Sequence, residues 1–155
     1  MEIIAAPPEI PGDVFESREI PSDVALVVPL VCRLVEQLVE EGCVAEADRR
    51  KVELCLDEAV TNAVIHGNGS VFGKQVRVQM FRDGDRWGIA ISDEGEGFTP
   101  DEIPDFDAEE QLWQECGRGI ALMRLFMDDV RYFDGGRTVV LVRKCPDSTE
   151  GTDAS

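Results

Sequence analysis

The stretch Leu56-Asp-Glu-Ala-Val-Thr-Asn-Ala-Val-Ile-His-Gly-Asn68 decides the architecture of this chain, because it joins a helical pattern to a row of polar side chains. Glu58, Asn62 and His66 are four residues apart, so a helix would carry all three on one face near its C-terminal end. This carboxylate, amide and imidazole interrupt a helix that is otherwise apolar. Taken alone, the row is either a solvated polar stripe or a functional one.

The helical pattern continues toward the N-terminus of this stretch. A helix is predicted from Ala45 to Ile65, with His66-Gly67 as its stop and a flexible turn after it. An earlier helix is predicted from Asp23 to Glu41, with Pro21-Ser22 as its turn and N-cap. Pro29 lies about a turn and a half inside that helix, which therefore starts late or is kinked.

Strands and one more helix surround this helical pair. The strands are expected at 14–20, 75–81, 86–92, 129–133 and 137–143, and the helix at 119–127. Tight turns at Asp83-Gly84-Asp85 and Asp134-Gly135-Gly136 join neighbouring strands. The predicted fold is an α+β two-layer sandwich, with a mixed, mainly antiparallel sheet and helices on one face. We expect one domain at 14–144, a lead-in at 1–13 and a disordered tail at 145–155.

The charge of the chain excludes some classes of partner. Its 155 residues include 15 basic and 32 acidic ones, which gives a formal net charge of −17. No surplus of Lys or Arg exists to neutralise phosphates, which excludes a general nucleic-acid binder and argues against docking on anionic lipid. A nucleotide ligand is compatible with this charge, since a local site can oppose the global field.

The cysteines and the first residues bear on the compartment. The five cysteines are odd in number and form no CxxC pair, so neither a disulfide framework nor a zinc site is indicated, and reduced thiols are expected. No basic signal-peptide region follows Met1, and no apolar run approaches the roughly 20 residues that span a bilayer. We expect a cytoplasmic protein.

Two more segments carry possible chemistry. In Asp93-Glu94-Gly95-Glu96-Gly97-Phe98, the glycines let the backbone approach a ligand closely, and Asp93 can accept a hydrogen bond from a ligand amine. The spacing of a calcium loop is absent, and a plain turn is the other interpretation. In Gly117-Arg118-Gly119, a helix N-terminus suits phosphate, and Arg118 adds a permanent positive charge.

The three segments together, by type, order and separation, resemble the N, G1 and G2 boxes of the Bergerat-fold ATPases, the superfamily of gyrase and the histidine kinases. Within it, the chain is most similar to the anti-sigma factor serine kinases. The stretch from Leu56 to Asn68 resembles their N box, and Asp93-x-Gly95-x-Gly97-Phe98 resembles their G1 box. Gly117 to Met123, followed by Met127-Asp128, resembles their G2 helix, so that the resemblance covers residues 14–144.

The resemblance implies Mg-ATP as the ligand. Asn62 would hold Mg²⁺ through its side-chain oxygen. Asp93 would bond the adenine amino group and so select ATP over GTP, while Gly95 and Gly97 would let the backbone close over the nucleotide. Glu58 would be the general base that takes a proton from a substrate serine or from water.

The remaining site residues follow from the same resemblance. Gly117 and Gly119 would cradle the phosphates, with Arg118 near the β- and γ-phosphates. Thr138 would contact the adenine side. For His66, contact with phosphate and capping of the helix are equally supported.

The segment from Glu94 to Gln114 would be the ATP lid, and it departs from expectation. From Glu94 to Glu115 there are nine acidic residues and no basic one, whereas a lid that closes on a polyphosphate should bring positive charge. Either Mg²⁺ and the helix N-terminus suffice, or the acidic lid faces a basic partner.

The expected function is an ATP-dependent serine/threonine protein kinase of the anti-sigma type, which binds a sigma factor and phosphorylates an antagonist protein. The resembling kinases act as homodimers. One alternative is an ATP-binding partner-switching module without kinase activity, and another is the detached ATPase domain of a histidine kinase system. Direct binding to nucleic acid or membrane is not expected.

Overall fold

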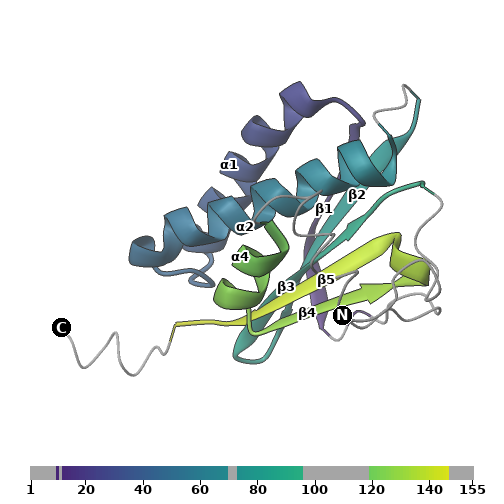
Figure 1. Cartoon of the computed structure of the whole chain (residues 1–155). Coiled ribbons are helices and arrows are strands. Elements are labelled where there is room, and N and C mark those ends of the chain that lie inside the picture. The colour runs from purple at the N-terminus through teal and green to yellow at the C-terminus, as the bar shows by residue number, and fades with distance from the viewer. Residues whose placement is uncertain (1–9, 11, 70–72, 96–118, 147–155) are drawn as a thin grey trace, which may run out of the picture.

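The chain folds into a single sheet covered on one side by helices (Figure 1). The computed structural model describes residues 10, 12–69, 73–95 and 119–146, apart from the side chains of His66 and of residues 119–122. In these residues the strand order is β1-β2-β3-β5-β4, and every neighbouring pair is antiparallel. The predicted α+β two-layer fold is confirmed, and the sheet, expected to be mixed and mainly antiparallel, is antiparallel in all of its described pairings.

The predicted elements are present, and their ends lie close to the predicted ones. The strands are β1 (Asp13–Pro21), β2 (Gln75–Asp83), β3 (Arg86–Ser92), β4 (Asp129–Phe133) and β5 (Thr138–Lys144). The α-helices are α1 (Val27–Glu40), α2 (Arg49–Asn62) and α4 (Gly119–Phe126). Short turns of other helical types are η1 (Val24–Leu26), η2 (Glu46–Asp48), η3 (Ala63–Gly67) and η5 (Asp134–Gly136).

The start of the first helix differs from its prediction in one respect. Asp23, and not Ser22, is the N-cap of η1, because its carboxylate accepts the Ala25 N–H at 3.0 Å. The Ser22 hydroxyl instead donates to the Lys74 carbonyl at 2.9 Å. Pro29 is the third residue of α1, in the first turn, where a backbone N–H has no partner within the helix. The late start expected from Pro29 is therefore confirmed.

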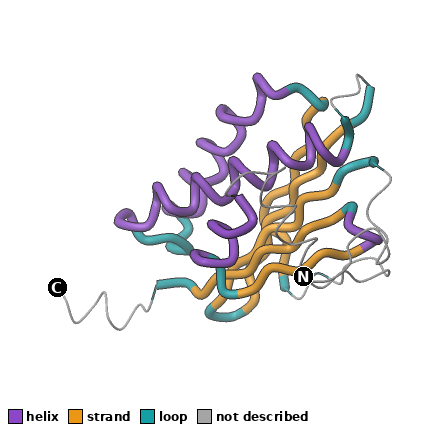
Figure 2. Tube along the Cα trace, viewed as in Figure 1, coloured by secondary structure: helices purple, strands orange, loops and turns teal. Residues whose placement is uncertain are grey.

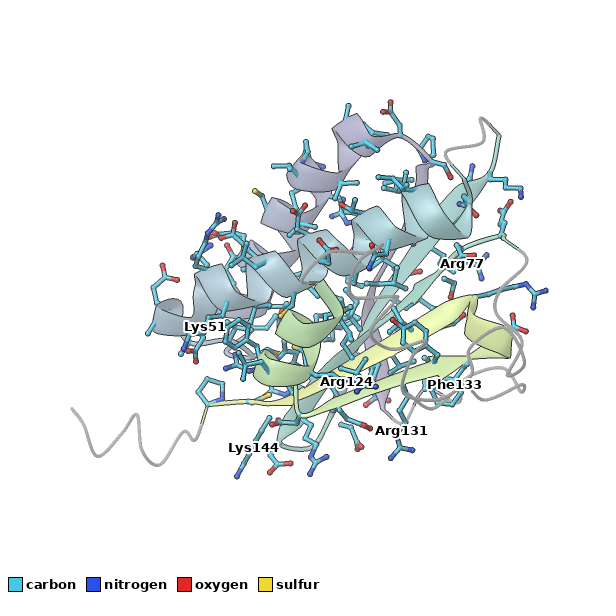
Figure 3. All side chains as sticks on the ribbon, viewed as in Figure 1. Lys51, Arg77, Arg124, Arg131, Phe133 and Lys144 are labelled. Carbon is cyan, nitrogen blue, oxygen red and sulfur yellow. The ribbon has the colours of Figure 1, made fainter. Side chains whose placement is uncertain are left out.

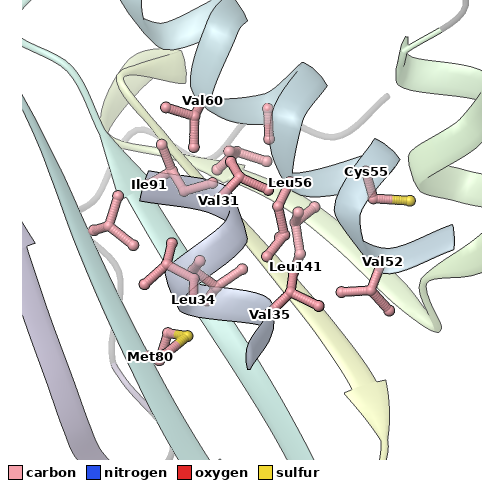
Figure 4. Packing of buried hydrophobic residues seen from close by; sticks show 14 of the residues in the cluster. Val31, Leu34, Val35, Val52, Cys55, Leu56, Val60, Met80, Ile91 and Leu141 are labelled. Carbon is pink, nitrogen blue, oxygen red and sulfur yellow. The ribbon is translucent and has the colours of Figure 1, made fainter. Parts of the chain in front are cut away.

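The core lies between the helical layer and the sheet. Figure 4 shows Leu34 of α1 and Leu56 of α2 among the side chains of the sheet, which include Met80, Ile91 and Leu141. Side chains alternate along β2, so that Val76, Val78 and Met80 are buried in this core. Burial at these positions fixes α1 and α2 on the sheet.

The edges of this core carry two further contacts. Lys51 of α2 places its ammonium 5.7 Å from the ring centroid of Phe126 in α4, and Figure 3 labels Lys51 beside that helix. Cys145 follows β5, where its side chain is buried in the core and its N–H donates to the Asp85 carbonyl at 2.7 Å. Cys145, which was expected to begin the disordered tail, is thus held by the fold.

The helices form a layer of their own in Figure 2. None of those in the described ranges combines the length and the apolar character needed to traverse a bilayer.

Candidate nucleotide site

The site begins where α2 passes into the π-helical turn η3. Glu58 and Asn62 lie one turn apart on α2, and both are half-buried. A π-helical turn holds more residues than an α-helical one, so it changes the direction in which the following side chains leave the helix. His66 lies in this turn, and its side chain falls outside the described residues. The regular spacing of the predicted row therefore applies to Glu58 and Asn62, and the phase changes before His66.

Asn68 ends this turn and joins it to three other segments. Its side chain is 1% exposed. The amide nitrogen donates to Ser22 Oγ at 2.7 Å and to the Gln75 carbonyl at 3.0 Å, and the amide oxygen accepts the Glu94 N–H at 2.6 Å. Sequence reasoning treated Asn68 as part of a turn and missed this role. The signal available was an amide side chain that directly follows the Gly67 stop.

Asp93 follows β3 and sits against the end of η3. Its carboxylate accepts the Gly95 N–H at 2.8 Å, and its own N–H donates to the Arg137 carbonyl at 2.8 Å. Burial raises the pKa of Asp93 to about 6, against the opposing effects of the Gly95 N–H and of nearby Arg137 and Lys74. At neutral pH this carboxylate is mostly ionised and suited to accept a hydrogen bond from an amine.

Two glycines bring the turn and the Asp93 loop into direct contact. A Cβ added at Gly67 would overlap the Asp93 carboxylate, and a Cβ added at Gly95 would overlap the Gly67 carbonyl. Gly95 therefore requires glycine because backbone packs against backbone there, and Gly67 requires it because the Asp93 side chain lies against it. Sequence reasoning assigned Gly95 to the approach of a ligand and Gly67 to the helix stop, and their mutual contact was not foreseen.

The opposite side of the loop is held by residues at the start of β5. Arg137 donates from Nε to the Gly95 carbonyl at 2.8 Å and from Nη1 to the Asp134 carbonyl at 3.1 Å. Thr138 is buried, and its hydroxyl lies 2.9 Å from Ser92 Oγ on the neighbouring strand. Thr138 is thus beside Asp93, where its contact with adenine stays a prediction. Sequence reasoning did not single out Arg137.

Part of the predicted site lies beyond the described residues. Gly97, Gly117, Arg118 and most of the lid at 94–114 are in this group, while Gly119 is the first residue of α4. In the ranges that are described, no three His, Cys, Asp or Glu side chains gather around a possible metal position. Mg²⁺ does not require such a cluster, since it binds one or two protein oxygens together with water and substrate phosphates.

The donor set that is present fits Mg-ATP. The Asn62 amide oxygen is a hard oxygen donor of the kind that Mg²⁺ binds, and it lies one turn from the Glu58 carboxylate on the same helix. The Asp93 carboxylate is an acceptor of the kind that an adenine amino group needs. The end of α2, η3 and the Asp93 loop are packed together through Gly67 and Gly95.

Comparison with known proteins agrees with this arrangement. The family model of the histidine kinase-like ATPase domain matches residues 20–144. The anti-sigma F factor of Pasteuria penetrans is 34% identical over 84 residues, which cover 52% of this chain and 55% of that protein. The anti-sigma F factor of Anoxybacillus flavithermus is 30% identical over 99 residues, which cover 60% of this chain and 67% of that protein. The chain therefore spans little more than half the length of the first relative. It belongs to the histidine kinase-like ATPase domain family, in the branch of the anti-sigma factor kinases.

Proposed function

We propose that this chain is an ATP-dependent serine/threonine protein kinase that binds a sigma factor and phosphorylates an antagonist protein. One observation carries the proposal: Glu58 and Asn62 lie a turn apart on α2, and the end of the same helical segment packs against Asp93 through Gly67. A base and a metal ligand thereby lie on one helix, and an acceptor for adenine lies against the end of that helical segment. The names of the two anti-sigma F factors support the choice of partners.

In this proposal, Asp93 selects the base of the nucleotide. Its ionised carboxylate accepts a hydrogen bond from the adenine amino group, whereas guanine presents a carbonyl acceptor at that position and would repel it. Thr138 lies beside Asp93 and contacts the adenine side. Gly95 lets the loop lie close to the end of η3, and Gly97 leaves room for the backbone to close over the nucleotide.

The phosphates lie toward α2 and the start of α4. Asn62 holds Mg²⁺ through its amide oxygen, and the bound ion would offset the negative charge of the phosphates. Gly117 and Gly119 cradle the phosphates at the N-terminus of α4, and Arg118 adds a positive charge near the β- and γ-phosphates. His66 either contacts a phosphate or caps the helix.

Glu58 is the general base of the transfer. Its carboxylate takes the proton of the substrate hydroxyl while the hydroxyl oxygen bonds to the γ-phosphorus. The bond from that phosphorus to the bridging oxygen breaks at the same time, and ADP leaves with the oxygen. The products are the phosphorylated antagonist, ADP and a protonated Glu58.

Transfer of the labelled γ-phosphate of ATP to a candidate antagonist tests this assignment. We expect Glu58→Ala to slow transfer by at least about 100-fold, the usual contribution of a positioned general base. Glu53→Ala is the matched control, because Glu53 is also a half-buried carboxylate on α2. Its Oε1 lies 3.7 Å from Arg50 Nη1. That control should transfer phosphate at the wild-type rate.

The outcomes separate the three candidate functions. Transfer that survives Glu58→Ala intact contradicts the role of Glu58. ATP binding without transfer to any candidate supports a partner-switching module. A phosphoprotein whose label is lost in acid indicates transfer to histidine, as in a histidine kinase system.

The partners are proposed to meet the acidic part of the chain. Nine acidic residues and no basic one lie between Glu94 and Glu115, which favours a partner with a basic surface. High salt should then weaken the complex, because it screens exposed charges. We also propose a homodimer, in line with the resembling kinases, and sedimentation analysis would test it.

A further inference from the structure

We propose that Asn68 is a positioning residue, which holds the loop Asp93-Glu94-Gly95 against the end of α2 and thereby orients Asp93 toward adenine. This inference rests on the proposed role of Asp93 in binding the base. It assigns to Asn68 a function beyond that of ending a helix.

The bonds of Asn68 show why it can do this. Its amide oxygen accepts the N–H of Glu94, the residue directly after Asp93, at 2.6 Å. Its amide nitrogen is itself held by Ser22 Oγ at 2.7 Å and by the Gln75 carbonyl at 3.0 Å. The side chain is 1% exposed, so water does not compete for these bonds. Asn68 is therefore a fixed point to which the loop is attached.

The partners of Asn68 are themselves anchored. The Ser22 hydroxyl donates to the Lys74 carbonyl at 2.9 Å, and the Ser22 N–H donates to the same carbonyl at 3.0 Å. Gln75 is the first residue of β2 and pairs with Pro21 of β1. Asn68 is thus held by the edge of the sheet as well as by the helical turn that it ends.

The loop is held from its other side by Arg137. The Arg137 carbonyl accepts the Asp93 N–H at 2.8 Å, and its guanidinium donates to the Gly95 carbonyl at 2.8 Å. These bonds attach the loop to the residue directly before β5 and not to α2. Without Asn68, the loop would keep its connection to the sheet and lose its side-chain hydrogen bond to the helical segment that carries Asn62 and Glu58.

Loss of that bond should affect one end of the nucleotide more than the other. The proposed site holds adenine at Asp93 and the phosphates beside α2, so Asn68 sets the position of the base relative to the phosphates. A small misplacement of a positioned group lowers binding selectively for the ligand that uses it. Recognition of adenine should therefore weaken, while contacts common to ATP and GTP should persist.

A double-mutant cycle with two nucleotides tests this inference by calorimetry on the full chain. We expect Asn68→Ala to weaken ATP binding about tenfold, which is about 1.4 kcal/mol, and to change GTP binding by no more than about twofold. Because Asn68 acts through Asp93, the double variant with Asp93→Asn should bind ATP no more weakly than Asp93→Asn alone. Equal weakening of ATP and GTP, or full additivity in the cycle, would overturn the inference.

A destabilised control separates positioning from a general loss of structure. Leu34→Ala removes a fully buried side chain of α1 that packs in the core between the helices and the sheet. Its folded fraction should keep the wild-type preference for ATP over GTP. A preference that falls in Leu34→Ala as much as in Asn68→Ala would show that stability, and not positioning, is responsible.

Amide hydrogen exchange supplies a readout that does not depend on nucleotide. The Glu94 N–H should exchange at least about tenfold faster in Asn68→Ala, because its buried acceptor is gone. The Cys145 N–H, bonded to the Asp85 carbonyl at 2.7 Å, should exchange at an unchanged rate relative to global unfolding. If Asn68→Ala does not fold, Ser22→Ala removes one support of the Asn68 amide and should accelerate Glu94 exchange by a smaller factor. Unchanged exchange at Glu94 in a folded variant would contradict the inference.

The same set of variants distinguishes failure of this inference from failure of the proposed function. Should Asp93→Asn bind ATP as tightly as the wild type does, the adenine assignment is wrong and the inference falls with it. Should Asp93→Asn lose ATP while Asn68→Ala keeps it, the proposed function stands and only the role of Asn68 is overturned.

Discussion

The two long helices, α1 and α2, have equal lengths of 14 residues and share one core, yet they end in different ways. α1 ends at Glu40, and Gly42 then takes a φ of +76°, so that the chain can turn away from the helix. α2 does not end with a simple turn. It continues through the π-helical turn η3 to Asn68, which binds three other segments.

The difference separates packing from function. The buried residues of α1 are all apolar, so its sequence is explained by the core. α2 contributes to the same core but also places Glu58 and Asn62 in half-buried positions. Neither side chain belongs to the apolar core, and the proposed function assigns them the roles of base and metal ligand. We therefore expect changes in α1 to affect stability and changes at the end of α2 to affect the ligand.

Leu34→Ala should have the largest effect on stability. Leu34 is fully buried between α1 and the sheet, and truncation of such a leucine lowers the free energy of unfolding by about 2–5 kcal/mol. ATP affinity per folded molecule should stay unchanged. Denaturant titration and calorimetry measure the two quantities, and a parallel loss of affinity would break the proposed division between the helices.

Asp93→Asn should have the next largest effect, on binding. A hydrogen bond to a charged group contributes about 1.5–3 kcal/mol, so ATP affinity should fall by about 10- to 100-fold. The fold should persist, because the amide oxygen can still accept the Gly95 N–H, which the Asp93 carboxylate accepts at 2.8 Å. Unchanged affinity in calorimetry would remove Asp93 from the adenine site.

The pH dependence of binding should follow Asp93. Burial raises its pKa to about 6, with a further increase from Asp134 and decreases from Arg137 and Lys74. Below this pKa the carboxyl group is neutral, so ATP affinity should fall by up to about tenfold per pH unit, or about 1.4 kcal/mol. The pH series is measured by calorimetry between about pH 5 and pH 8.

The stability of the unliganded chain should move in the opposite direction. The ordinary pKa of 3.8 applies to Asp93 in the unfolded chain, so between about pH 4 and pH 6 the folded state binds more protons at this residue. The contribution of Asp93 to stability therefore increases as the pH falls through this window. Asp93→Asn should lose the contribution of this residue to the pH dependence of both ATP affinity and stability. Any pH dependence of ATP affinity that the variant keeps comes from the ionisation of the nucleotide itself. If Asp93→Asn kept the wild-type pH profiles, Asp93 would not be the source of these pH dependences.

Asn62→Ala should have the smallest effect. Loss of one neutral ligand oxygen removes about 1 kcal/mol of interaction, and the dependence of ATP binding on Mg²⁺ should decrease or disappear. Titrations with and without Mg²⁺ measure the difference. Gln37→Ala, on the half-buried side of α1, is a matched amide control that should retain the full dependence on Mg²⁺.

Local patterns explain how much of this molecule could be predicted from its sequence. β3 and β4 begin and end at the predicted residues, because turn residues such as Gly84 and Gly135 lie close to their ends. The placement of Glu58 and Asn62 on one helix was also predictable, because it depends only on helical spacing.

Contacts between distant residues account for what could not be predicted. Asn68 meets Ser22 across 46 residues of sequence, and Arg137 meets Gly95 across 42. A local sequence pattern does not predict hydrogen bonds between residues so far apart in the chain. The π-helical turn η3 is hidden for a similar reason, since its sequence also suits an α-helix and tertiary packing decides between them. Ser22 and Asp23 are both good N-cap residues. Asp23 became the cap because the Ser22 hydroxyl donates instead to the Lys74 carbonyl.

The contact between Gly67 and Gly95 has a consequence for how this family member can change its sequence. Two side chains in contact can exchange volume, since one may shrink where the other grows. At Gly95 a Cβ would overlap the backbone carbonyl of Gly67, and a carbonyl cannot be shortened by substitution. A substitution at Gly95 therefore has no compensating substitution at Gly67, and a substitution at Gly67 would displace the Asp93 carboxylate on which the proposed site depends. Adaptation to new ligands must therefore come from the surrounding residues, while these two positions stay locked together.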